Sequence, residues 1–193
     1  HDDKTYKIHN TIEMPNGSIG NILDLTDITV GDKTVLNTDK KFRYGSSKSH
    51  TAAHIVHASL RNILGDNVSQ AGSNVEPGRL RFDFSHSKKV NDEELDEIFT
   101  LSNQVIFENY LISTNIMNID DAKKTGALAF FGDKYDDEVR LVEIANGDRF
   151  SYEVCGGTHV SNTGEVGSVF ITNESSIGSG MRRIEAISGR KAE

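Results

Sequence analysis

Four side chains of types that bind transition metals fall into two short motifs. His50 and His54 stand four residues apart within SHTAAHIVHASLRNIL, residues 49–64, and Cys155 and His159 stand four apart within CGGTH. On a helix, two histidines at this spacing project from one face, so both can reach a single ion at roughly 2 Å. The H-x3-H and C-x3-H motifs together predict a tetrahedral zinc site.

The conjunction of the two motifs, rather than either one alone, carries this prediction. The two glycines after Cys155 let the loop bend so that thiolate and imidazole converge. The competing interpretation makes His50 and His54 ordinary helix-surface residues and the lone cysteine a small buried hydrophobe. His57 shares the predicted face, and its role is packing or orienting a metal-bound imidazole. Thr51 stands where H-E-x-x-H proteases have glutamate, so that hydrolytic route is excluded.

The elements that must position these motifs indicate an α+β fold, an antiparallel sheet packed with two main helices. One helix is predicted from an N-cap at Ser49 to Gly65, and a second from Asn91 to about Asn109. Residues 38–48 are polar and predicted to be a connector, and residues 65–78 a loop. The other expected elements are the strands RLRFDFSH, LISTNIM, EVRLVEIA, RFSYEV, VGSVFITNES and MRRIEAIS, and a helical turn near DDAKKTG.

The N-terminal part has a different pattern. Short alternating segments between Ile8 and Val35, among them KTVLN, are separated by turn residues and predict small antiparallel strands. They hold too few apolar residues for a core of their own. Residues 1–42 are therefore predicted to be a small β-barrel-like remnant, and residues 43–193 the second domain.

Composition limits the class of protein. The chain has 193 residues, 36% hydrophobic and 26% charged, as in ordinary globular proteins. Its apolar runs are too short to span a membrane. A net charge of −8 excludes an indiscriminate nucleic-acid binder, because phosphate neutralisation needs clustered Lys and Arg, but it allows a local basic groove. The single cysteine excludes an internal disulfide and predicts a reducing, cytoplasmic location.

Several segments resemble the editing domain of alanyl-tRNA synthetase, in the family's order: SHTAAHIVHASL, VSQAGS, GRLRFDFSH, GALAFFGDKY, CGGTHVSNTGEVG and ESSIGSGMRRIEAISG. They cover about residues 43–189. The resemblance implies a domain that hydrolyses seryl- or glycyl-tRNA for alanine, with zinc as cofactor and the tRNA acceptor end as partner. An alanine pocket rejects glycine or an added hydroxyl poorly, which is why such editing exists. The family's oligomerisation region would follow and is absent, so we expect a piece of a longer enzyme.

The resemblance also implies roles for individual residues. The family's zinc ligands fall on the same four residues as the spacing argument. Gln70 of VSQAGS is implied to act on the substrate together with Arg183, although either Arg182 or Arg183 could face it. Further substrate or tRNA contacts are expected from Ala53, Gly156, Gly157, Arg79 and Arg182, and other candidate cations for the tRNA end are Lys48, Arg61 and Arg81.

One departure and several alternatives accompany this interpretation. Members of the family usually carry threonine where this chain has Ala53, so weaker discrimination of serine is predicted. The alternatives are a free-standing alanyl-tRNA editing protein, a threonyl-tRNA synthetase-like editing domain, and a non-catalytic zinc-stabilised tRNA-binding module. Four protein ligands would also close a tetrahedral site, so zinc either activates water after a ligand is displaced or only shapes the pocket.

Overall fold

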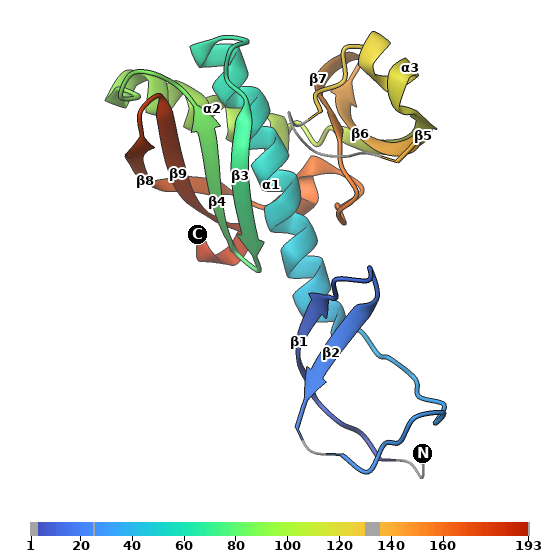
Figure 1. The fold of residues 1–193 in the computed structure, drawn as a ribbon. Coiled ribbons are helices and arrows are strands. Elements are labelled where there is room, and N and C mark those ends of the chain that lie inside the picture. Colours follow the sequence, from blue (N-terminus) through green and yellow to red (C-terminus); the bar gives the residue numbers. More distant parts are fainter. Residues whose placement is uncertain (1–3, 25, 130–135, 193) are drawn as a thin grey trace. The chain divides into compact units, whose positions relative to one another are not determined.

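The computed structural model describes residues 4–24, 26–129 and 136–192. The chain forms two compact units, His1–Thr38 and Asp39–Glu193 (Figure 1). The second half of the GALAFFGDKY motif, residues 130–135, lies outside the described residues. Of the helices that the structure describes, none is long and apolar enough to cross a membrane.

The smaller unit contains an antiparallel hairpin. β1 (Ile8–Glu13) pairs with β2 (Ile19–Leu23), and Gly17 in the connecting turn has φ +79°, a conformation that favours glycine. The prediction of a further strand at KTVLN is wrong, because these residues have no pairing partner in the described part of the chain. The barrel-like remnant stays a prediction.

The larger unit is an α+β structure with two antiparallel sheets, which confirms the predicted class. A four-stranded sheet has the order β3-β4-β9-β8, and a three-stranded sheet has the order β5-β6-β7. The elements are α1 (Lys40–Leu64), β3 (Gln70–Glu76), β4 (Arg79–Ser85), α2 (Asp92–Phe107), β5 (Leu111–Asn118), α3 (Ile119–Lys124), β6 (Glu138–Asn146), β7 (Asp148–Val154), η1 (Thr163–Val166), β8 (Val169–Gly178), β9 (Met181–Ser188) and η2 (Gly189–Lys191).

Helix α1 begins earlier than the sequence pattern predicts. Asp39 is its N-cap and accepts hydrogen bonds from the backbone N–H groups of Lys41 and Phe42, both at 2.9 Å. Ser49 is therefore not a cap but a buried residue inside the helix. The prediction of a connector at residues 38–48 is wrong because polar side chains there cover the solvent-facing side of a continuing helix. The predicted end at Gly65 is confirmed.

The core lies between α1, α2 and one face of the four-stranded sheet. Phe82 of β4 pairs across to Ile184 of β9, and both are buried in the same cluster as the apolar residues of the two helices. The next pair, Asp83 and Arg183, points to the opposite face because side chains alternate along a strand. α1 also lies near β7 of the three-stranded sheet, so one helix meets both sheets (Figure 1).

Helix α2 begins at the predicted N-cap Asn91, and the structure shows a capping box there. Asn91 Oδ1 accepts from the Glu94 backbone N–H and Glu94 Oε2 accepts from the Asn91 backbone N–H, both at 2.9 Å. Asn91→Ala is expected to lower the free energy of unfolding by about 1 kcal/mol. Urea unfolding measures this change, with the nearby exposed Lys89→Ala as the control. Equal stability of the two variants would contradict it.

Candidate metal centre

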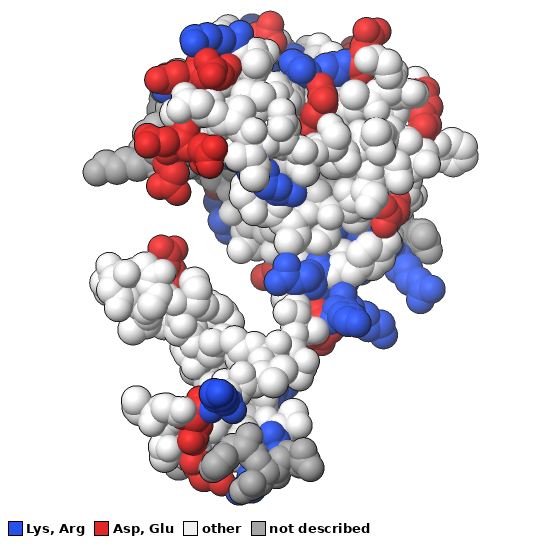
Figure 2. Space-filling model, turned by 90° about the vertical axis from the view of Figure 1, so that its right-hand side faces the viewer, with Lys and Arg blue, Asp and Glu red and all other residues white. Residues whose placement is uncertain are grey.

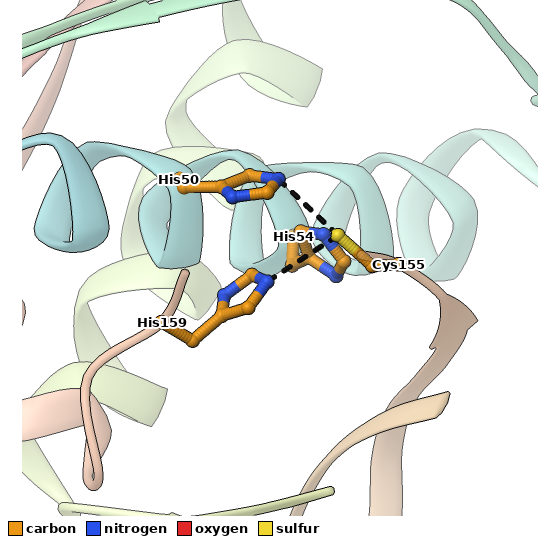
Figure 3. Close-up of side chains that lie close together, drawn as sticks. All are labelled: His50, His54, Cys155 and His159. Atoms are coloured by element: carbon orange, nitrogen blue, oxygen red, sulfur yellow. Dashed lines mark hydrogen bonds between the residues drawn. The ribbon is translucent and has the colours of Figure 1, made fainter. Parts of the chain in front are cut away.

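The four predicted ligands converge on one point beside α1 (Figure 3). His50 and His54 project from the helix, whereas Cys155 and His159 lie on the loop after β7. The four candidate ligand atoms lie within 4.8 Å of one another, and Cys155 Sγ is 3.4 Å from Nε2 of both His50 and His159. Ligand atoms about 2.0–2.3 Å from a tetrahedral ion stand about 3.3–3.8 Å apart. This group could therefore hold a metal ion.

The ligand histidines have further contacts that orient their rings. His159 Nδ1 lies 3.1 Å from Thr51 Oγ1, and the same hydroxyl accepts a hydrogen bond from the Val160 backbone N–H at 3.3 Å. His54 Nδ1 faces a carboxylate oxygen of Glu153 at 3.6 Å. Such contacts fix the tautomer and orientation of a metal-binding imidazole.

Glu153 is at the centre of a buried polar network beside this group. Its carboxylate lies 3.2 Å from His57 Nδ1 and 3.6 Å from His54 Nδ1, and it accepts a 2.8 Å hydrogen bond from Ser151 Oγ. Burial opposes its ionisation, but the facing imidazoles and the hydroxyl outweigh burial and lower the pKa of Glu153 to about 2. With Nδ1 facing the carboxylate, His54 has Nε2 left for an ion. Glu153 was not predicted from the sequence, although the polar pair Ser151 and Glu153, two positions apart in the strand RFSYEV, was a signal.

Burial favours the uncharged forms of the candidate ligands. It lowers the pKa of His50 to about 4, that of His159 to about 2 and that of His54 as well, and the neighbouring imidazoles add to the effect. Burial also raises the pKa of the Cys155 thiol. Neutral imidazoles are the form that binds metal, whereas the thiol must release its proton on binding.

The loop that carries Cys155 is held by Arg140 of β6, a second residue that was not predicted from the sequence. Arg140 Nη1 donates to the carbonyl oxygens of Cys155 at 3.1 Å and Gly157 at 2.6 Å. A Cβ atom on Gly157 would lie 2.2 Å from His50 Cε1, whereas one on Gly156 would meet nothing within 4 Å. Neither glycine has a positive φ. Close approach to His50, rather than a sharp bend, is therefore the reason for glycine at position 157.

The two strand arginines are engaged elsewhere. Arg183 makes a bidentate ion pair with Asp83 at 2.7 and 2.8 Å on the outer face of the sheet. Arg182 makes a bidentate pair with Glu174 at 2.5 and 2.7 Å on the opposite side. In the described residues, no hydrogen bond or ion pair joins either arginine to the metal-binding group, so their predicted roles stay predictions.

The remaining predicted residues are spread over the larger unit. Gln70 begins β3 and its Nε2 donates to Ser73 Oγ at 3.2 Å. Arg79 pairs with Glu185 at 2.9 Å. Ala53 is 3% exposed and packs in the main hydrophobic cluster. The roles predicted for these three residues stay predictions.

Comparison with known proteins identifies the relatives of the chain. A family described as the threonyl and alanyl tRNA synthetase second additional domain matches residues 139–185, which include Cys155 and His159. An alanine–tRNA ligase of Solibacter usitatus is 46% identical over 179 residues, 93% of this chain. The alanine–tRNA ligase of Carboxydothermus hydrogenoformans is 48% identical over 162 residues, 84% of the chain.

Over these residues the chain belongs to the alanine–tRNA ligase family. The alanine–tRNA ligase of Rhodopseudomonas palustris, 44% identical over 173 residues, agrees with this assignment. The chain spans only about a fifth of these relatives, 20%, 18% and 20% of their lengths. The resemblance stated from the sequence motifs is thereby confirmed at the level of the family.

Proposed function

We propose that the chain hydrolyses the ester between serine or glycine and the 3′ end of alanine tRNA, at a zinc site formed by His50, His54, Cys155 and His159. The supporting observation is the convergence of these four side chains in a relative of alanine–tRNA ligases. Imidazole nitrogen and thiolate sulfur are the donors that zinc prefers, so the residues fit the ion. The orphaned His54 Nδ1 and the buried Glu153 beside it fit a metal-bound imidazole with a carboxylate behind it.

The residues of the chain divide the work of this reaction. Zinc, when bound, supplies a Lewis acid that polarises the ester carbonyl or lowers the pKa of a bound water to about 7. Thr51 is proposed to orient the imidazole ring of His159, and Glu153 that of His54. Gln70 is proposed to help place the attacking water. A site that attaches alanine to tRNA cannot reject glycine or serine well enough by binding alone. Hydrolysis of the wrongly formed esters supplies the missing discrimination.

The test is release of serine from seryl-tRNA for alanine by this chain, with and without a chelator. We expect release that depends on zinc, whereas alanyl-tRNA stays intact. Cys155→Ala should abolish release, because it removes the thiolate ligand. Chelator-insensitive release, or release undiminished in the Cys155→Ala variant, would show that the zinc site does not carry the reaction.

The four-ligand geometry also favours a second candidate, a zinc-stabilised module that binds tRNA without hydrolysing it. Four protein ligands fill a tetrahedral site, as in structural zinc centres. In that case chelation should unfold the larger unit, because binding free energy is then folding free energy. Circular dichroism during metal removal, together with tRNA binding and no serine release, would identify this alternative.

A further inference from the structure

Eight of the seventeen Lys and Arg residues that the structure describes in the larger unit have a carboxylate partner. Among the residues that the structure describes, the ion pairs of this unit involve Arg61, Arg79, Arg81, Lys123, Lys124, Arg149, Arg182 and Arg183. Of the candidate cations named from the sequence for holding tRNA, only Lys48 is outside this set. A carboxylate partner offsets the positive charge of an arginine, so the paired set attracts a phosphate less strongly than unpaired cations do.

The unpaired cations gather instead at one end of the unit. Arg140 has no carboxylate partner but donates to the carbonyl oxygens of Cys155 and Gly157. Within the described part of Asp39–Glu193, the other exposed or half-exposed cations without a carboxylate partner are Lys40, Lys41, Arg43, Lys48, Lys88, Lys89, Arg190 and Lys191. All but Lys88 and Lys89 lie on the first turns of α1 or on η2. On the face drawn in Figure 2, several Lys and Arg side chains gather at one end of this unit.

The start of α1 and η2 both pack against the turn between β3 and β4. The Lys191 side chain lies over Gly78, where an added Cβ would be 2.9 Å from Lys191 Cδ. The Gly78 backbone N–H donates to Ser49 Oγ of α1 at 3.0 Å. Pro77, in the same turn, packs against Gly45 of α1. The start of α1, the turn between β3 and β4, and η2 thus form one continuous surface, which we call the basic end.

Exposed aromatic side chains stand among these cations. In KKFRYGSSK, residues 40–48, Phe42 is 61% exposed and Tyr44 is 47% exposed. Lys48 Nζ lies 4.8 Å from the centre of the Tyr44 ring. Glu165 is occupied by the Tyr44 hydroxyl, which donates to it at 2.7 Å. Cations interleaved with exposed aromatics are the combination that binds phosphates and stacks unpaired bases.

We propose that the basic end binds the acceptor arm of tRNA, with its cations on the phosphates and Phe42 stacked on an unpaired base. This inference rests on the proposed function, because it names the surface by which that substrate is held. Ser47 of α1 donates a 2.9 Å hydrogen bond to Thr158 Oγ1, in the loop between Cys155 and His159, so the start of α1 adjoins the metal centre. In a chain with net charge −8, such a local concentration of unpaired cations supplies the phosphate contacts that the total charge does not.

The test is fluorescence anisotropy of a labelled acceptor-stem RNA hairpin with a single-stranded 3′ end, titrated with the full chain over a range of salt concentrations. Arg190→Gln/Lys191→Gln and Lys40→Gln/Lys41→Gln should each weaken binding and lower the slope of log affinity against log salt by about two, one for each lost phosphate contact. Phe42→Ala should weaken binding roughly tenfold and leave the slope unchanged.

The control is Lys88→Gln/Lys89→Gln, which removes the same charge from the unpaired cations after β4 and should leave both affinity and slope unchanged. The proposal would be overturned if the slope of log affinity against log salt stayed unchanged in both basic-end variants. It would also be overturned if the control lowered this slope as much as they do. Release of serine from a short seryl-adenosine ester by the unmodified chain is measured in parallel. RNA binding as expected without ester release would contradict the proposed function alone, and the reverse result would contradict this inference alone.

Discussion

Glu153→Gln is expected to lower zinc affinity by roughly 10–100-fold, the usual effect of removing the carboxylate behind a metal-bound imidazole. The side chain keeps its size, but its new amide N–H₂ must face an imidazole N–H of His54 or His57, both of which now face carboxylate oxygens. One imidazole then loses its acceptor or turns over. If His54 turns, Nε2 no longer offers its lone pair to the ion. The affinity is measured by competition with a chromophoric chelator.

The same substitution should also lower the stability of the metal-free chain. Leaving a buried donor unsatisfied costs about 1–3 kcal/mol in the free energy of unfolding, which urea denaturation measures. Glu143→Gln is the matched control, since that side chain is 30% exposed and pairs with Arg149 on the same sheet. It should cost at most about 1 kcal/mol and leave zinc affinity unchanged. Equal zinc affinity of the two variants would show that Glu153 does not position His54.

The metal-binding group was predictable because its information is local. The four-residue spacing within each motif fixes which side chains share a helix turn or a loop, and the two motifs then needed only to meet. Strand β9, Met181–Ser188, coincides with the predicted MRRIEAIS for the same reason: its alternation of buried and less buried residues is complete within the segment. The C-terminal end of α1 at Gly65 and the start of α2 at Asn91 were predictable because each capping residue bonds with the backbone of its own helix.

Even where a polar residue such as Glu153 stands out within its strand, its contacts were not predictable, because they join distant segments of the chain. Glu153 reaches His57 across 96 positions of sequence, and no local pattern signals that pairing. Strand β3 was predicted as a loop because QAGSNVE has weak strand preference, and it is a strand because β4 supplies the hydrogen-bonding edge beside it. The first turns of α1 were predicted as a connector because their residues are mostly polar. They are polar because these turns are exposed to solvent, and the helix continues through them.

Gly157→Ala is expected to abolish measurable zinc binding while leaving the rest of the larger unit folded. The new methyl group would stand 2.2 Å from His50 Cε1 and 2.6 Å from Nδ1, well inside van der Waals contact. The loop cannot easily retreat, because Arg140 holds the Gly157 carbonyl at 2.6 Å. His50 must therefore turn away, and its Nε2 leaves the position 3.4 Å from Cys155 Sγ.

Gly156→Ala isolates this effect, since the neighbouring position has open space for a methyl group and an ordinary φ. Both variants reduce backbone freedom in the same loop to the same extent, so they differ only in the contact with His50. Cobalt absorption spectra distinguish them: the Gly156→Ala variant should give the intense bands of a thiolate-containing tetrahedral site, and the Gly157→Ala variant should not. Circular dichroism of both checks that the fold is retained. Matching cobalt spectra would mean that His50 is not a ligand or that the loop opens without cost, and either result would remove the steric reason for the second glycine of CGGTH.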